Sequence, residues 1–228
     1  PPIFFFKQKT ASAIMPSLVG SEMCIRDRGS STGKITYKRH VADEGTDEWD
    51  FIGSPVIGQD LQNLIDNNST LATNGSQVAI GVFNNNANAD TAAAMYTNYN
   101  TSGNSGTTLV SGQGFAMATD EGSTTATVDF TGTINTSDVS FAIDDASSSN
   151  TNYGKWNLVA NPFPSFLNAN DDADNTNNFL TVNASNLHTS FAAIYAYDGD
   201  GTFTAINHTN PGSAVYIAPG QGFFVASD

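Results

Sequence analysis

The sequence predicts an all-β fold: a β-sandwich or jelly-roll-like structure built from two pseudo-repeated halves, with at most one or two short helices. Three features of the 228-residue chain favour it. Only 13% of the residues are charged, 11% are aromatic, and Asn, Thr, Ser and Gly separate short apolar runs. Aromatic and β-branched side chains favour strands, whereas small polar residues favour turns. The hydrophobic share of 39% argues against disorder.

An internal repeat predicts the two halves. Residues 49–55 (WDFIGSP) align without gaps with residues 156–162 (WNLVANP), 107 positions further along the chain. Residues 111–118 (SGQGFAMA) align with residues 219–226 (PGQGFFVA) at a spacing of 108. Two separate motifs that share nearly one spacing indicate a duplication.

We therefore expect a first β repeat over residues 33–135 and a second over residues 136–228, packed as one unit. Short runs of strand-forming residues between Asn- and Gly-rich turns predict the individual strands. These runs are residues 34–39, 77–83, 94–99, 107–110, 124–130, 140–143, 192–197, 202–206 and 214–217. The one helix expected, residues 59–67, places Leu61, Leu64 and Ile65 on one face.

The repeated motifs are expected to serve structure rather than ligand binding. Proline ends a strand because it lacks the N–H of the ladder, and the glycines beside Gln supply positive φ and close approach. The Gln amides are expected to satisfy backbone groups, and the Trp and Phe side chains are expected at equivalent core positions. The motif residues are Trp49, Pro55, Gly112, Gln113, Gly114, Phe115, Trp156, Pro162, Gly220, Gln221, Gly222 and Phe223.

Charge and motif content exclude several classes of function. The net charge of −14 argues against binding to nucleic acid or to anionic membranes, and no apolar run approaches the ~20 residues of a membrane span. His40, His188 and His208 lack zinc-site spacing, and neither a G-x-S-x-G elbow nor a phosphate loop occurs. We expect no catalytic, cofactor-binding or metal-binding residues, so the chain is not expected to be an enzyme.

Carboxylates and tyrosines leave a second interpretation open: a calcium-assisted adhesion or carbohydrate-binding module. The carboxylates gather in three loops, at Asp43, Glu44, Asp47, Glu48 and Asp50, at Asp171, Asp172 and Asp174, and at Asp198 and Asp200. None matches an EF-hand, and DGDG at residues 198–201 favours a hairpin turn. Tyr96, Tyr99, Tyr195 and Tyr197 are expected in the core or in cross-strand pairs, although outward-facing rings would stack on sugars. A divergent carbohydrate-active enzyme would need two converging acids in a cleft.

The N-terminal segment differs from the rest of the chain. Residues 4–28 hold four of the eight Lys and Arg residues and the only cysteine, Cys24. KQKT at residues 7–10 and MCIRD at residues 23–27 resemble translated sequencing-adapter sequence. A signal peptide is the alternative, but aromatic residues precede its charges and basic residues follow where a cleavage site belongs. We expect residues 1–32 to be a non-native, disordered leader.

The repeated motifs also carry a family resemblance. KWNLVANPFPS at residues 155–165 and IAPGQGFFV at residues 217–225 resemble the region that precedes the C-terminal sorting domain in type IX secretion cargo proteins. The resemblance extends over residues 33–228. It implies a secreted or cell-surface location, neighbouring domains in a larger chain, with a sorting domain after Asp228, and no established catalytic residues.

Together these observations predict a non-catalytic secreted or cell-surface module, acting as a stalk, spacer or presentation region. The partners expected are neighbouring domains, glycans or other surface proteins, with no nucleic acid and no insertion into a membrane. No cofactor is expected, and calcium belongs only to the second interpretation.

Overall fold

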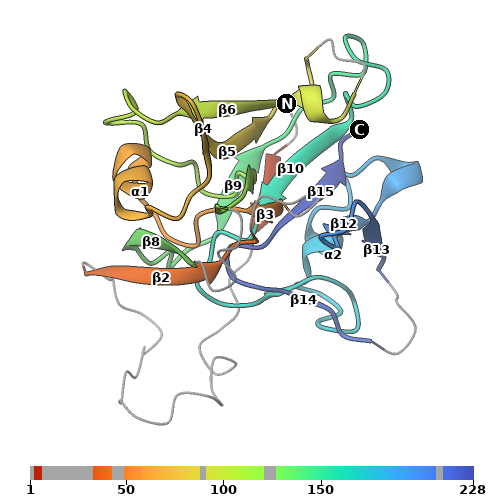
Figure 1. Cartoon of the computed structure of the whole chain (residues 1–228). Coiled ribbons are helices and arrows are strands. Elements are labelled where there is room, and N and C mark those ends of the chain that lie inside the picture. Colours follow the sequence, from red (N-terminus) through yellow and green to blue (C-terminus); the bar gives the residue numbers. More distant parts are fainter. Residues whose placement is uncertain (1–2, 7–32, 43–48, 88–90, 121–126, 209–212) are drawn as a thin grey trace.

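The computed structural model describes residues 3–6, 33–42, 49–87, 91–120, 127–208 and 213–228. Short antiparallel strands dominate this part of the chain, arranged in several small sheets (Figure 1), which confirms the predicted all-β, sandwich-like fold. The α-helices are α1 (Leu61–Asn67) and α2 (Phe179–Val182). Within the described ranges, no helix has the length and apolar character needed to cross a membrane.

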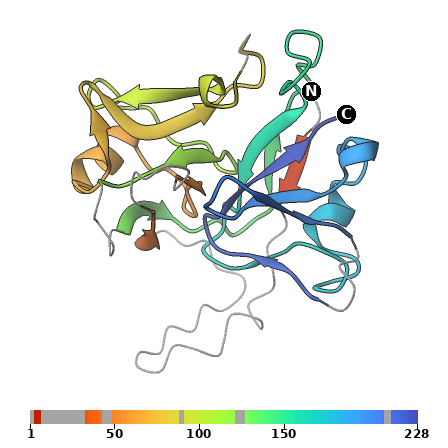
Figure 2. The same cartoon turned by 45° about the vertical axis from the view of Figure 1, so that its right-hand side comes forward.

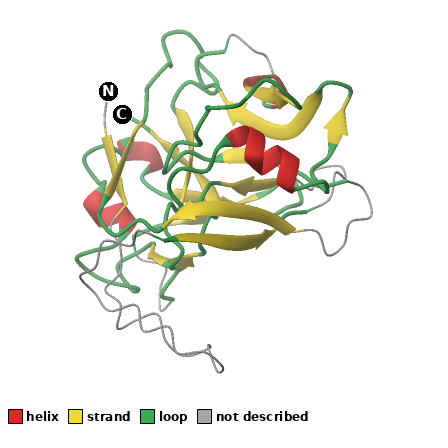
Figure 3. Ribbon diagram, turned by 90° about the vertical axis from the view of Figure 1, so that its left-hand side faces the viewer, coloured by secondary structure: helices red, strands yellow, loops and turns green. Residues whose placement is uncertain are grey.

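The first half is a small sandwich of two sheets around its own core. The larger sheet contains β3 (Asp50–Ile52), β7 (Phe115–Met117), β5 (Gln77–Phe83) and β4 (Thr73–Asn74) in that order, and β6 (Tyr96–Asn100) also pairs with β5. The second sheet pairs β2 (Lys34–His40) with β8 (Thr127–Thr133), and α1 packs beside it (Figure 3). Ile52, Leu64, Phe115 and Phe130 are fully buried between these elements.

The second half repeats this arrangement beside the first (Figure 2). Its main sheet contains β10 (Trp156–Ala160), β15 (Gly222–Ala226), β12 (Ile194–Tyr197) and β13 (Phe203–Ile206) in that order. Two smaller pairs complete it: β11 (Leu167–Asn168) with β14 (Tyr216–Ile217), and β9 (Val139–Ala142) with β1 (Ile3–Phe6). Val159, Phe163, Phe179 and Phe223 form the centre of its core.

Each half therefore has a separate apolar core, because the two buried clusters share no residue. The halves are nevertheless joined directly, through isolated β-bridges that link Ile52 with Gln221 and Gln113 with Val159.

Most of the predicted strands are present, and the exceptions have local causes. Residues 107–110 form no regular strand, because Leu61 N donates to Thr107 O (2.8 Å) and Leu109 N donates to Gln59 O (2.9 Å), which ties the segment to the start of α1. The segment predicted from residue 94 begins as the 3₁₀ turn η2 (Ala93–Met95) before β6. Residues 124–126 of another predicted strand lie outside the described residues.

The prediction of a disordered leader is corrected at Ile3–Phe6, which form β1. This apolar, aromatic run favours extended backbone, and it pairs antiparallel with β9, Ile3 opposite Ala142 and Phe6 opposite Val139. β1 is thus the antiparallel partner of β9 in the second half, as β8 is the antiparallel partner of β2 in the first half. The rest of the predicted leader, apart from these four residues, lies outside the described ranges.

Candidate functional site

The repeated motifs form equivalent strand pairs in identical register. In the first half Ile52 of β3 lies opposite Phe115 of β7, and in the second half Val159 of β10 lies opposite Phe223 of β15. These are the same aligned positions of the two motifs. Phe115 and Phe223 are both fully buried, as predicted for equivalent core residues.

Each GQG segment is a type II turn that leads into the second strand of its pair. Gln113 N donates to Val110 O (3.2 Å), and Gln221 N donates to Ala218 O (3.0 Å). The third residue of each turn is a glycine with positive φ, 89° at Gly112 and 67° at Gly220, as this turn type requires. In the second half, the Gln221 carboxamide also accepts a hydrogen bond from Ala218 N (2.9 Å), as expected for an amide that satisfies backbone groups.

The two halves are held together by reciprocal main-chain hydrogen bonds between these motifs. Gly53 N donates to Gly220 O of the second half, and the aligned Ala160 N donates to Gly112 O of the first half, both at 2.9 Å. The Trp-to-Pro segment of each half therefore bonds the GQG turn of the other half. We call these exchanged contacts the reciprocal lock.

Glycine is required in the lock because the backbones approach so closely. A Cβ added at Gly222 would lie 2.7 Å from the carbonyl carbon of Phe51, and a Cβ added at Gly114 would lie 2.7 Å from Cγ of Leu158. Phe51 and Leu158 are aligned positions, so this contact is also exchanged between the halves. Pro55 and Pro162 are buried just beyond the two strands.

The two tryptophans do not occupy the fully buried positions that the sequence predicts, since both are half-buried. Trp49 packs on the small side chains of Ala72, Ala79 and Ala118. Trp156 instead meets the ring of Tyr195 edge-on, with centroids 4.9 Å apart. Both indoles lie on the sheet face opposite the core, because strand side chains alternate between faces and Ile52 and Val159 occupy the core side.

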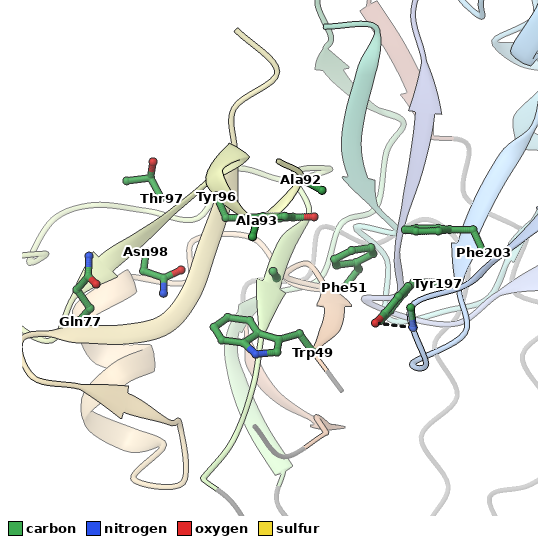
Figure 4. A pocket seen from close by; sticks show the side chains of 12 residues that line it. Trp49, Phe51, Gln77, Ala92, Ala93, Tyr96, Thr97, Asn98, Tyr197 and Phe203 are labelled. Carbon is green, nitrogen blue, oxygen red and sulfur yellow. Dashed lines mark hydrogen bonds between the residues drawn. The ribbon is translucent and has the colours of Figure 1, made fainter. Parts of the chain in front are cut away.

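An open groove of about 700 Å³ lies over this outer face in the first half (Figure 4). It runs between the β3–β7–β5–β6 sheet and the β12–β13 hairpin of the second half. The lining residues are Trp49, Phe51, Gln77, Ala92, Ala93, Tyr96, Thr97, Asn98, Ala116, Tyr197, Gly201 and Phe203. Both halves therefore contribute to a site that neither forms alone. We call it the aromatic groove.

The register of the two sheets explains why side chains cover the outer face in the second half and leave it open in the first. In the second half, Phe224 of β15 lies opposite Tyr195 of β12, and in the first half the equivalent pair is Ala116 of β7 opposite Gly81 of β5. Tyr195 covers Trp156, whereas the glycine at position 81 has no side chain with which to cover Trp49. Two large rings are thus replaced by a methyl group and a hydrogen atom.

Aromatic rings from both halves meet along the groove. The Phe51 ring lies 5.0 Å from Tyr197 and 6.2 Å from Phe203, which belong to the second half, and 6.4 Å from Tyr96 of the first. Gly201 N donates to the Tyr197 hydroxyl (3.1 Å), which holds that side chain at the edge of the hairpin (Figure 4). Phe203 is 46% exposed, so its ring remains accessible.

The described residues that line the groove are uncharged. Burial raises the pKa of Tyr96 above its usual range, and the neighbouring Tyr197 raises it further, so the Tyr96 phenol stays protonated at neutral pH. Gln77, Thr97 and Asn98 add carboxamide and hydroxyl groups along the β5–β6 side. The aromatic groove therefore combines ring faces with neutral hydrogen-bonding groups.

The described carboxylates are used locally rather than gathered around a metal. The residues 198–201 form the predicted hairpin turn, in which Asp198 accepts from Thr204 Oγ1 (2.9 Å) and Asp200 accepts from Thr202 N (3.0 Å). Asp171 lies 3.2 Å from His208 Nδ1, an interaction that contributes most to the lowered pKa of this carboxyl. Among the described residues, no three His, Cys, Asp or Glu side chains form a metal-sized cluster.

The remaining candidates take part in local structure. His188 Nδ1 accepts from Ser190 N (3.2 Å) and begins the 3₁₀ turn η3 (Thr189–Phe191), while His40 ends β2. Asp50 accepts from Ala42 N (2.9 Å). Four of the predicted acidic residues, Asp43, Glu44, Asp47 and Glu48, lie outside the described residues.

Of the four tyrosines considered from the sequence, Tyr96 and Tyr197 line the groove, whereas Tyr195 covers Trp156 and Tyr99 packs toward Phe115. Trp49, Phe51 and Phe203 were not predicted to line a binding surface. One signal was available in the motif alignment: Ala116 aligns with the much larger Phe224, so the two halves differ in side-chain size at this position.

Comparison with known proteins gives a family but no described activity. Searches of curated proteins and of solved structures found no significant match. A family described as "Domain of unknown function (DUF8693)" matches residues 17–228, which is most of the chain and spans both halves and the aromatic groove between them. The chain therefore belongs to the DUF8693 family.

Proposed function

We propose that this chain is a non-catalytic module of a secreted or cell-surface protein exported by the type IX system, where it serves as a stalk, spacer or presentation region. The reciprocal lock is the observation that carries the proposal. The most distinctive residues of the sequence, the two Trp-to-Pro segments and the two GQG turns, are used to join two sandwiches through their backbones.

A spacer has to transmit position between its neighbours, and the lock suits that task. Two domains joined by a flexible linker move relative to one another by default. Here the N–H groups of Gly53 and Ala160 each donate a hydrogen bond to a turn of the opposite half. A Cβ atom added at Gly114 or Gly222 would collide with atoms of the opposite half. These close contacts favour a single stiff unit over two hinged ones.

The chemistry of the groove also supports a non-catalytic module. General acid–base catalysis needs a titratable side chain within hydrogen-bonding reach of the substrate. The described residues of the groove lining are uncharged, and Tyr96 and Tyr197 are the titratable groups among them. Burial raises the pKa of Tyr96 and makes it a poorer proton donor at neutral pH.

A fusion experiment tests the spacer proposal. The full chain is inserted between a folded reporter and a type IX sorting domain and expressed in a bacterium that has this secretion system. We expect the reporter on the cell surface and accessible to added protease while the inserted chain resists cleavage. Retention of the fusion in the periplasm, or cleavage within the insert, would contradict the proposal. Turnover of glycoside or ester substrates by the purified chain would contradict its non-catalytic part.

A second candidate function, the calcium-assisted adhesion or carbohydrate-binding module, is favoured by the aromatic groove. Its calcium part is tested separately by thermal unfolding with calcium and with a chelator. A cation that binds only the folded state raises the unfolding midpoint, so equal midpoints would remove calcium from this candidate.

A further inference from the structure

We propose that the aromatic groove binds a neutral oligosaccharide, with Trp49 and Phe203 as stacking surfaces and Gln77 and Asn98 as hydrogen-bonding groups. This inference names the site and ligand class of the second candidate function. It does not depend on the spacer function, which rests on the main-chain hydrogen bonds of Gly53 to Gly220 and of Ala160 to Gly112.

The groove is built into the fold. Gly81 and Ala116 stand where the second half has Tyr195 and Phe224, so the sheet face beside Trp49 lacks the rings that cover its counterpart. The missing side chain at Gly81 also gives room to a polar one. A Cβ there would lie 2.7 Å from Asn98 Oδ1, so glycine allows the Asn98 carboxamide to lie across the strand.

The size and shape of the groove favour an extended ligand. The volume of about 700 Å³ lies within the roughly 300–1,000 Å³ of ordinary ligand pockets and exceeds what a single small group would fill. The groove is open and lies between the β3–β7–β5–β6 sheet and the β12–β13 hairpin (Figure 4). An extended chain of sugar rings fits such a groove.

The chemical groups that line the groove match those of a sugar ring. Pyranose rings present C–H groups on one face, which pack on aromatic rings, and hydroxyl groups at their edges, which need donors and acceptors. Trp49, Phe51 and Phe203 supply ring surface. Gln77 and Asn98 supply carboxamides that both donate and accept, and neither side chain hydrogen-bonds to the described part of the chain.

Among the described residues, the groove lining carries no charge. An anionic ligand would find no cation among the twelve lining residues and would approach a chain with a net charge of −14. A quaternary ammonium ligand is attracted to ring faces arranged around a compact cage. Here Phe51 packs directly against Tyr197 at 5.0 Å, so the rings line a long wall instead, and a neutral ligand is the better match.

Titration calorimetry on the full chain tests this proposal. The probes are soluble neutral hexasaccharides: cellohexaose, laminarihexaose, xylohexaose, mannohexaose, maltohexaose and chitohexaose. Tetramethylammonium and polygalacturonate serve as the cationic and anionic arms. We expect at least one neutral hexasaccharide to bind at millimolar or lower concentration, and we expect neither charged probe to bind.

Variants then place the binding in the groove. Ala116→Phe copies the residue of the second half and fills the site without removing a ring, so we expect loss of binding with an unchanged or raised unfolding midpoint. Trp49→Ala and Asn98→Ala should each weaken binding by about tenfold or more, the equivalent of ~1.4 kcal/mol. Trp156→Ala, the aligned tryptophan outside the groove, and Phe166→Ala, an exposed ring elsewhere, are the matched controls and should bind normally.

Three results would overturn the inference. The first is no binding of any neutral hexasaccharide, and the second is binding of a charged probe instead. The third is full binding by folded Ala116→Phe. Each leaves the spacer proposal intact, because surface display of the fusion does not require an open groove.

Discussion

The two halves of this protein share a backbone and differ in the side chains that cover its outer face. In the second half, Tyr195 and Phe224 fill that face, with Tyr195 edge-on to Trp156. In the first half, Gly81 and Ala116 leave the face open beside Trp49. The buried phenylalanines and the GQG turns, by contrast, occupy equivalent positions in the strand register of the two halves. The difference separates the residues that join the two halves, which are equivalent in both, from the residues of the outer face, which are not.

The shared features extend beyond the two motifs that identified the repeat. Thr119 Oγ1 donates to Ala42 O (3.0 Å), and the aligned Ser227 Oγ donates to Asp144 O (2.7 Å). Asp50 and Asn157 likewise accept from the backbone N–H groups of Ala42 and Asp144. These bonds fasten the segment after β2, or after β9, to the end of the main sheet. The features that the two halves share are thus backbone contacts and the hydrogen bonds of short polar side chains.

The strongest way to break the comparison is at the two core phenylalanines. Phe115→Ala and Phe223→Ala each remove a fully buried ring from the centre of one core. Each should lower the free energy of unfolding by about 3–5 kcal/mol, and the two losses should be similar. Chemical denaturation measures both. A loss below 1 kcal/mol in one variant alone would show that the positions are not equivalent.

The reciprocal lock gives the next largest effect. Gly114→Ala and Gly222→Ala place a Cβ against the other half, and we expect each to cost about 2–3 kcal/mol because backbone atoms must move. Calorimetry should also show the single unfolding transition broaden or split. Gly33→Ala is the control, since Gly33 has open space around its Cα and should tolerate the change within about 0.5 kcal/mol.

The tryptophans sharpen the comparison, because their surroundings differ. Trp156→Ala should cost about 2 kcal/mol and Trp49→Ala about 1 kcal/mol, both below the ~3–5 kcal/mol of a fully buried ring. Trp156 loses contacts with the rings of Tyr195 and Phe191, whereas Trp49 loses contacts with three alanines. Urea unfolding of both variants checks the order. Equal losses, or a larger loss at Trp49, would contradict this account of the groove.

The smallest effect concerns an ion pair just before Trp156. Hydrogen bonds from Lys155 (2.7 Å) and Ser147 lower the pKa of Asp145 to about 2, from an ordinary value of 3.8. A depressed folded-state pKa contributes stability above pH 4 and loses it as pH falls toward 2. Asp145→Asn should therefore cost about 1 kcal/mol or less at pH 7, and the difference from wild type should vanish by pH 2. Thermal midpoints across this pH range measure it.

The sequence predicted the frame because local physical rules determine it. Local rules predict the proline after each strand, the positive-φ glycine of each turn and the buried Phe that follows it. Because the motifs are duplicated, each of these predictions is supported by two segments of the chain. Residues 77–83 have the bounds of β5. The four-residue helix α2 was missed, because it is too short to show a helical period.

The groove was not predictable in the same way, because it depends on contacts between segments distant in sequence. Phe51 and Tyr197 are 146 residues apart and meet only when the lock places the β12–β13 hairpin beside β3. Tyr96 and Tyr197 were expected in the core or in cross-strand pairs, and both do pair across strands, with Phe83 and with Phe203. Strand alternation identifies the two faces of a sheet without saying which one is covered. Sheet register decided that question.

The pairing of β1 with β9 has a consequence for handling the protein. β9 is held on that side by main-chain groups of Ile3–Phe6, a segment separated from residue 33 by residues outside the described ranges. A version trimmed to residues 33–228 would expose the N–H and C=O groups of Val139–Ala142 as a bare strand edge. Bare edges recruit other strands, so such a version is expected to self-associate or to accept an added strand peptide in trans.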